Sequence, residues 1–233
     1  MGAAEQMEQE FINFLKMVAE TPNVYLTLGG DLLDNGVKNS VTNVYRQRYM
    51  PADAKKMMAK MLEPVKDRIL CAVAGNHERR SREVDDDPMY DIMAKLDIEH
   101  LYRENIAFVR CAFGNNRKDG WRNPTYFIVV THGAGGGMLT GGAVNRGERF
   151  GYTIDGMDAL IVGHTHKPFS TQPGKIKIDP FNNTVSVKPF KVISATSWLE
   201  YGGYAAQKML SPPTHCLSTL MLRGTKKEMI VTM

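Results

Sequence analysis

The residues Gly163-His164-Thr165-His166 directly follow an apolar run at positions 159–162. A short apolar run that ends at a glycine predicts a buried β-strand. Two histidines therefore stand where the strand stops. In open α/β sheets, ligands gather beyond the carboxyl ends of the strands. The junction predicts a strand that delivers two candidate metal ligands to a binding site.

Three further junctions of this kind lie upstream. They are Gly30-Asp31-Leu32-Leu33-Asp34, Gly75-Asn76-His77-Glu78 and the lone His132 after residues 126–130. Each puts a carboxylate, an amide or an imidazole just beyond a predicted strand. One such junction is a weak signal. Four in succession are hard to explain by packing, so we expect these side chains to meet in one site.

The remaining pattern indicates an α/β protein. Helical spacing of apolar residues predicts helices over residues 7–18, 52–62 and 89–96. Strands are predicted over residues 24–28, 68–74, 108–109, 126–130 and 159–162, and shorter ones over 185–187, 192–194, 217–222 and 229–231. We expect a layered sandwich with sheets in the middle and helices outside, formed as one domain over residues 1–233.

Composition and charge exclude several classes. The 233 residues are 43% apolar and 23% charged, which is ordinary for a globular protein. Apolar runs are too short to span a bilayer, and the start does not resemble a signal peptide. Cys71, Cys111 and Cys216 indicate reduced thiols, so a cytoplasmic protein is expected. The net charge of +4 tolerates a polyanionic substrate without predicting one.

The residue types at the junctions favour a divalent metal. Aspartate, asparagine and histidine without thiolates suit Mn²⁺, Fe or Zn²⁺ and argue against a structural zinc knot. One carboxylate such as Asp31 can bridge two ions. Two ions about 3.5–4 Å apart can activate water and clamp a phosphoryl group.

The order of these motifs resembles that of calcineurin-like metallophosphoesterases. The resemblance runs from about residue 24 to residue 168 and more loosely to the end. It implies a four-layer α/β/β/α sandwich and two divalent ions, with Mn²⁺ as first choice and Fe, Zn²⁺ or Ni²⁺ as alternatives. It also implies a metal ligand set of Asp31 as bridge, Asn76, His132 and His164 at one ion, and His166 at the other.

Two further residues take roles from the same resemblance. His77 would protonate the leaving oxygen or stabilise the transition state, and Asp34 would orient His77 or support its loop.

One element of the family pattern is missing. Family members begin with a strand that ends in Asp-x-His, and this chain has no such pair before Asp31. The second metal site therefore keeps only Asp31 and His166. We expect the sandwich to be N-terminally truncated, with a longer form that supplies the pair.

Candidate substrate contacts lie in the sequence directly after the candidate metal ligands. Arg79 and Arg80, with Arg82, are either phosphate contacts or a solvated loop balanced by residues 85–87. Residues 133–137, with Gly141 and Gly142, form a glycine-rich stretch that we interpret as a lid over the metal site. Beyond it, Asn145, Arg146 and Arg149 either meet a phosphate or lie in a solvated loop. Trp198 and Tyr204 are assigned to aromatic packing in the second sheet rather than to a substrate pocket.

The sequence thus favours a metal-dependent phosphodiesterase, nuclease-like and similar to phage and bacterial relatives of DNA-repair exonucleases. Its substrate would be a phosphodiester such as DNA or a nucleotide, hydrolysed by a metal-bound hydroxide. Two alternatives stay open: a degenerate, non-catalytic module that binds metal or nucleic acid, and a phosphomonoesterase or protein phosphatase of the same superfamily. The oligomeric state is open, with a homodimer as one alternative.

Overall fold

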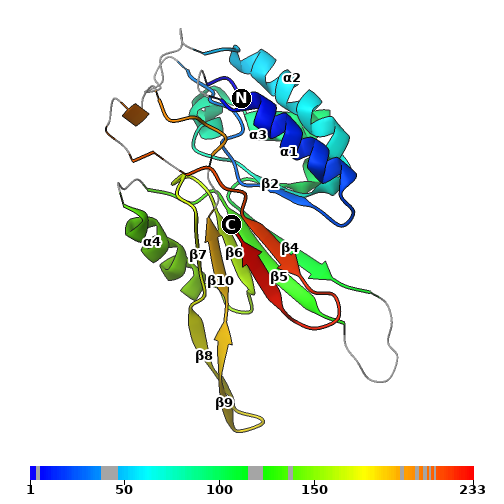
Figure 1. Ribbon diagram of the computed structural model, residues 1–233, viewed down its shortest axis with the longest axis vertical. Helices are drawn as coiled ribbons and strands as arrows, with labels where there is room; N and C mark the ends of the chain where they lie inside the picture. Colours follow the sequence, from blue (N-terminus) through cyan, green and yellow to red (C-terminus); the bar gives the residue numbers. More distant parts are fainter. Residues whose placement is uncertain are drawn as a thin grey trace.

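The structure is a computed structural model. It describes residues 1–3, 6–37, 47–114, 123–135, 139–194, 197–202, 205–206, 209, 211–212 and 214–233. In these residues, helices lie on the outside and sheets in the middle (Figure 1). No helix of these segments combines the length and apolar character needed to cross a membrane.

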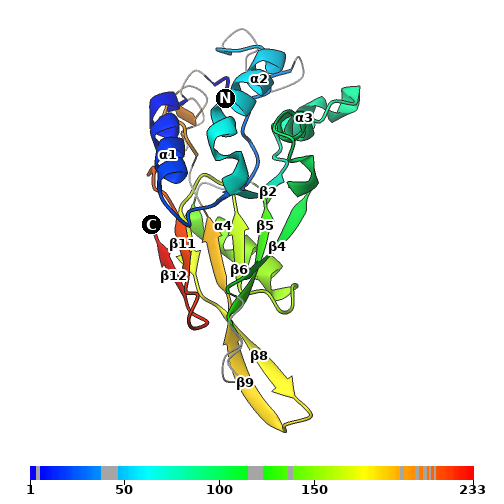
Figure 2. The ribbon, with the colours of Figure 1, turned by 90° about the vertical axis from the view of Figure 1, so that its right-hand side faces the viewer.

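The first half of the chain forms one helical layer and a small parallel sheet. The sheet has the order β1-β2-β3, formed by Leu26–Leu28, Ile69–Val73 and Tyr102–Arg103. The helices α1 (Glu8–Glu20), α2 (Pro51–Leu62) and α3 (Pro88–Lys95) lie on one side of it (Figure 2). Helices α2 and α3 both begin at a proline, which suits the first helical turn. The sequence predicted these elements to within two residues at their ends, except β3, which it did not predict.

The second sheet has five strands in the order β4-β5-β6-β10-β7. Strands β5, β6 and β10 run parallel, whereas β4 and β7 are antiparallel edge strands. Helix α4 (Thr140–Tyr152) covers the outer face. The strand bounds are Ile106–Ala112 for β4, Thr125–Thr131 for β5, Ala159–Val162 for β6, Phe169–Thr171 for β7 and Lys191–Ser194 for β10.

Three apolar clusters fill the spaces between the layers. The first lies among α1, α2, α3 and the small sheet, and the second between α4 and the large sheet. The third brings Cys71 and Val73 of β2 against Ile128 and Val130 of β5, so the two sheets pack face to face. This order gives the predicted α/β/β/α arrangement. Cys71 is a buried core residue, and burial raises the pKa of its thiol to about 12.

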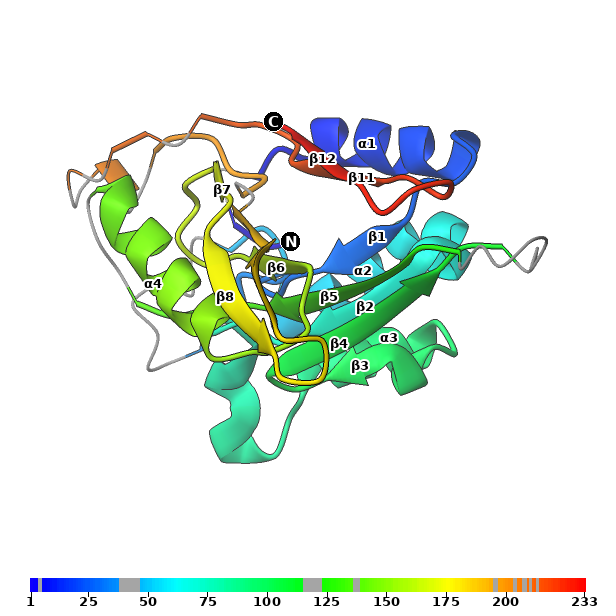
Figure 3. The same cartoon turned by 90° about the horizontal axis from the view of Figure 1, so that it is seen from below.

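Two hairpins complete the described chain. Strands β11 (Thr219–Leu222) and β12 (Met229–Thr232) pair with each other, and the hydroxyl of Tyr126 on β5 contacts the carbonyls in their turn. Strands β8 (Gly174–Asp179) and β9 (Thr184–Pro189) form a second hairpin that projects beyond the large sheet in Figures 1 and 2, and Figure 3 views the molecule from the end where this hairpin lies. Within the described residues, the short 3₁₀ helices η2 (Glu63–Arg68), η3 (Glu78–Val84) and η4 (Glu99–Leu101) form connections.

Two interpretations of the sequence were wrong. Residues 140–152 form helix α4 instead of a loop, so Gly141, Gly142, Asn145, Arg146 and Arg149 lie on a helix; residues 136 and 137 of the expected lid lie outside the described residues. Trp198 packs on Phe11 and Phe14 of α1 rather than in the second sheet. Tyr204 lies outside the described residues.

Helix α4 depends on close backbone approach to the sheet. A Cβ atom added at Gly151 would lie 2.4 Å from a ring carbon of Phe190, and one at Gly147 would lie 2.8 Å from Val192. At Gly141, in the first turn, nothing lies within 4 Å. The glycines that weaken helix propensity at 147 and 151 are therefore those that let the helix reach the core.

We predict opposite effects for alanine at two glycines of α4. Gly151→Ala should lower the free energy of unfolding by about 1–3 kcal/mol, because the new methyl group overpacks against Phe190. Gly141→Ala should leave it unchanged or raise it by up to about 1 kcal/mol, because alanine favours the helix. Urea denaturation of both variants measures this difference, and equal effects would contradict the packing argument.

Candidate metal centre

The turns after β1 and β2 meet backbone to backbone. A Cβ atom at Gly75 would lie 2.0 Å from Oδ1 of Asp31, and one at Gly30, where φ is +90°, would lie 2.5 Å from the amide nitrogen of Gly75. Any side chain at either position would push the turns apart. The two glycines therefore allow Asp31 and Asn76 to approach one another.

A buried carboxylate joins the same two turns. Glu78 is 1% exposed and accepts hydrogen bonds from the amides of Asp31 (2.8 Å), Leu33 (3.0 Å) and Gly75 (2.9 Å). Burial and the negative charge of Asp31 raise the pKa of Glu78. The three amides supply the partners that a buried carboxylate needs. Glu78 thus fixes the backbone on which the candidate ligands stand.

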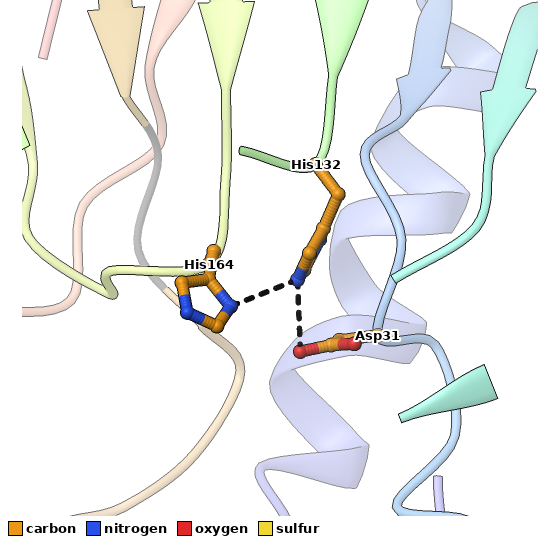
Figure 4. Close-up of side chains that lie close together, drawn as sticks. All are labelled: Asp31, His132 and His164. Atoms are coloured by element: carbon orange, nitrogen blue, oxygen red, sulfur yellow. Dashed lines mark hydrogen bonds and ion pairs between the residues drawn. The ribbon is translucent and has the colours of Figure 1, made fainter. Parts of the chain in front are cut away.

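Four side chains converge beyond the strand ends. Nε2 of His132 lies 3.2 Å from Oδ2 of Asp31, 2.9 Å from Oδ1 of Asn76 and 3.2 Å from Nδ1 of His164. Nδ1 of His164 is 2.7 Å from the same Asn76 oxygen. Figure 4 shows Asp31, His132 and His164 turned toward one another. The ligand atoms of these three residues all lie within 4.8 Å of one another.

The backbone fixes how His132 presents its ring. Its Nδ1 lies 2.8 Å from the carbonyl oxygen of Gly29, which can only accept, so Nδ1 carries the proton. In the neutral ring, Nε2 then directs a lone pair at Asp31 and Asn76. Burial acts to lower the pKa of His132, but the Asp31 carboxylate, the Gly29 carbonyl and the charge of Glu78 together raise it above its usual value. Burial opposes ionisation of Asp31, yet contacts with His132 and His77 lower its pKa to about 2.

This arrangement fits a divalent cation. Oxygens of Asp31 and Asn76 and ring nitrogens of His132 and His164 face one centre, and each of the four groups can offer a lone pair in its neutral or ionised form. A cation at that centre satisfies them together. The mixed oxygen and nitrogen set suits Mn²⁺, Fe or Zn²⁺.

His77 lies beside this group with one defined tautomer. Its Nδ1 is 2.8 Å from the carbonyl oxygen of Asp34 and 3.4 Å from the Asp34 carboxylate, so Nδ1 is protonated. Its Nε2 lies 3.9 Å from Oδ2 of Asp31 and 3.1 Å from a guanidinium nitrogen of Arg80. Burial acts to lower the pKa of His77, but the Asp34 hydrogen bond and the charge of Asp31 raise it above its usual value.

His166 stands apart from the group. Both His164 and His166 have positive φ, at +66° and +52°, in the sharp turn after β6. Burial lowers the pKa of His166, and the negative charge of Asp31 acts in the opposite direction. Its ring is nevertheless outside the compact group that Asp31, His132 and His164 form among the described residues.

The sequence profile of the calcineurin-like phosphoesterases matches residues 6–168, which is more than half of the chain. The chain belongs to the calcineurin-like phosphoesterase family. A search of curated proteins found no match. Membership identifies the protein as a metal-dependent phosphoester hydrolase, and the cluster at the strand ends is where a phosphoesterase of this family would hold a divalent ion.

In this phosphoesterase, the candidate arginines differ in their surroundings. The Arg79 guanidinium contacts the carbonyls of Ala74 and Glu104 and the Asn105 side chain. The Arg80 guanidinium donates to the Asp34 carbonyl at 2.9 Å. Both belong to η3, so they do not lie in the solvated loop that was one alternative. Arg82 pairs with Asp87 and Glu104 at the surface.

Arg146 lies on α4, with its guanidinium against Gly135. A Cβ atom at Gly135, where φ is +84°, would collide with Nη1 of Arg146 at 1.6 Å. The positive charge of Arg146 also contributes to the lowered pKa of His164, after burial and the charge of His132. Arg146 is therefore close enough to the cluster to act on it electrostatically.

Sequence reasoning missed the roles of Glu78, Gly30 and Gly75. All three stand in the motifs, but their spacing does not reveal a hydrogen bond or a close approach across 45 residues or more. A charged residue directly after a candidate catalytic histidine was the available signal. Its burial depends on how the two turns pack, which the sequence does not show.

We predict that Mn²⁺ stabilises the wild-type protein. At a concentration about 100 times the dissociation constant, the ion should add about 2.7 kcal/mol to the free energy of unfolding. His132→Ala should abolish most of this gain, because it removes the ring at the centre of the cluster. Thermal denaturation with and without Mn²⁺ measures the effect. His100→Ala, at an exposed position on η4, is the matched control and should respond like wild type.

Proposed function

We propose that this phosphoesterase is a phosphodiesterase that uses two divalent ions, with Mn²⁺ preferred. Asp31, Asn76, His132 and His164 would hold the first ion, and His166 with Asp31 would contribute to the second. The support is the convergence of the first four residues and the electrostatic interaction between His166 and Asp31.

The observation that supports catalysis most directly is the position of His77. The Asp34 hydrogen bond and the charge of Asp31 raise the pKa of His77 against the effect of burial, and perturbed pKa values cluster at functional sites. Its Nδ1 proton is held by Asp34, and its Nε2 faces the side of Asp31. The two protonation states of His77 therefore differ only at Nε2, the atom nearest the cluster.

Different groups of the site would perform different parts of ester hydrolysis. Divalent ions in such a site neutralise phosphoryl oxygens and lower the pKa of a coordinated water. In the structure Nε2 of His77 accepts a hydrogen bond from Arg80, so His77 would protonate the leaving oxygen only after Arg80 moves off Nε2 and that atom takes up a proton; Asp34 keeps the ring oriented. Arg80, which contacts both Asp34 and His77, would hold this pair in place.

We further propose a nuclease-like substrate, such as DNA or a nucleotide, and a relationship to phage and bacterial repair phosphoesterases. The support is the motif that includes residues 76–80 and a mildly basic chain with a net charge of +4. Arg79, Arg80 and Arg146 are the candidate phosphate contacts. Arg146 is exposed to solvent, whereas Arg79 and Arg80 are partly buried.

Hydrolysis of bis(p-nitrophenyl) phosphate in Mn²⁺ tests the proposal. We expect the diester to be hydrolysed faster than p-nitrophenyl phosphate. His77→Ala should lower kcat by about 10²–10⁴, the usual contribution of a general acid. Arg82→Gln is the matched control on the same helix, because Arg82 faces Asp87 and Glu104. It should keep full activity.

Other outcomes favour the alternatives. Faster hydrolysis of the monoester would identify a phosphomonoesterase or protein phosphatase. Binding of Mn²⁺ without hydrolysis of either ester would identify a non-catalytic binding module. Full activity in His77→Ala would remove this residue from the mechanism.

We propose that the protein is a homodimer, on the basis of an exposed apolar face of the β8–β9 hairpin. On the β8–β9 hairpin, Ile176 pairs with Val187 and Ile178 pairs with Val185, so all four lie on one face. Each is at least 69% exposed, and the charged Lys177, Asp179 and Lys188 lie on the other face. An isolated two-stranded hairpin is marginally stable in water. A second copy presents the same uncharged face and can cover it without bringing like charges together.

Sedimentation velocity tests this arrangement. We expect the wild type to be a dimer and Ile178→Lys to be a monomer, because the variant buries a charge in the interface. Ser186→Lys puts the same residue on the opposite face and should remain dimeric. A monomeric wild type, or a dimer that persists in Ile178→Lys, would rule out the hairpin interface.

A further inference from the structure

A cavity of about 330 Å³ lies between α4 and the ends of β4, β5 and β6. We call it the α4 pocket. Its apolar wall is formed by Ile106, Ala143, Phe150, Val162 and Phe169. Such a volume is at the small end of ligand sites, roughly 300–1,000 Å³, which are mostly apolar with a few polar groups.

The α4 pocket adjoins the metal cluster. Gly133 and Gly163, which border it, are the neighbours of His132 and His164 in the sequence. Arg146 lines it as well, and its charge reaches His164. His77 does not line it and lies with Asp31 and Asp34 on the side of the first sheet. His77 therefore lies outside the pocket, although Arg79 of the neighbouring helix η3 lines it.

Two polar atoms of the lining residues have no partner. Nε of Arg79 and Oγ1 of Thr165 are buried and make no hydrogen bond within the part of the chain that the structure describes. A buried polar group without a partner is costly, because it has lost its hydrogen bonds to water. Thr165 is one of the residues that line the cavity, so its hydroxyl is a candidate hydrogen-bond partner for a bound ligand. A ligand with polar atoms on an otherwise apolar ring would then satisfy it.

We propose that the α4 pocket binds a heteroaromatic ring, of nucleobase size, on the ester group that stays attached to phosphorus. This inference rests on the proposed phosphodiesterase function. The phosphate would lie at the cluster, where Arg146 adds positive charge between ring and phosphate. The leaving group would lie outside the pocket, beside His77. The walls exclude water from the ring, and Thr165 supplies a hydrogen bond to its edge.

Two esters with the same leaving group test the pocket. Thymidine 5′-(p-nitrophenyl phosphate) carries the ring, and methyl p-nitrophenyl phosphate lacks it. We expect wild type to prefer the thymidine ester in kcat/KM. Ala143→Leu, which fills the pocket, should lower kcat/KM for the thymidine ester about tenfold or more and leave the methyl ester unchanged. Asn145→Leu, at an exposed position of the same helix, should keep the preference.

A second pair of variants isolates the hydroxyl. Thr165→Val should lower kcat/KM for the thymidine ester about three- to tenfold, because one neutral hydrogen bond is lost. Thr171→Val is the matched control, because its hydroxyl is also buried without a partner but lies on β7 outside the pocket. Neither variant should unfold the protein, since each removes a polar atom that had no partner. An equal fall in kcat/KM for both esters in Ala143→Leu or Thr165→Val would overturn the proposal. Equal kcat/KM values for the two esters in wild type would overturn it as well.

Binding separates failure of the pocket from failure of the proposed function. Calorimetry compares thymidine 5′-monophosphate with deoxyribose 5-phosphate, which has the phosphate and sugar but no base. Tighter binding of the monophosphate in wild type and Asn145→Leu, lost in Ala143→Leu, would support the pocket even if neither ester is hydrolysed. Equal binding of both ligands in wild type would reject the pocket, whatever the activity.

Discussion

The site depends on one buried carboxylate. Glu78 accepts three amide hydrogen bonds from the turns after β1 and β2, and these turns carry Asp31 and Asn76. A buried charge is costly unless it is hydrogen-bonded, and three buried amides are costly without an acceptor. The buried carboxylate of Glu78 therefore requires the three amides, and the amides require the carboxylate. The two glycines that let the turns touch are useful only because Glu78 closes the contact.

Rings and backbone then determine the electrostatics of the cluster. The carbonyls of Gly29 and Asp34 hold the Nδ1 protons of His132 and His77, so each ring directs Nε2 toward Asp31. His132 offers a lone pair to a cation, and its contact with Asp31 keeps that carboxylate ionised. Second contacts of this kind orient ligands before an ion arrives. The backbone thus assigns different roles to two similar histidines.

Much of this arrangement follows from sequence, and the exceptions have physical causes. Apolar runs gave the strands before each motif, because buried strands need little beyond local patterning. Helix α4 was missed because it contains four glycines, which argue locally against a helix. It forms because Gly147 and Gly151 let it approach Val192 and Phe190, residues more than 35 positions away. The role of Glu78 was missed for the same reason, since both depend on contacts between distant segments.

Strand geometry links the metal cluster to the α4 pocket. Successive side chains of a strand point to opposite faces of the sheet. At the end of β5, Val130 packs between the sheets, Thr131 lines the pocket, and His132 turns back to the cluster. At the end of β6, Val162 lines the pocket and His164, two residues later, is a candidate ligand. A shift of either strand end would move a wall of the pocket and a ligand together, so binding of a ring and binding of a metal ion are expected to be coupled through these two strands.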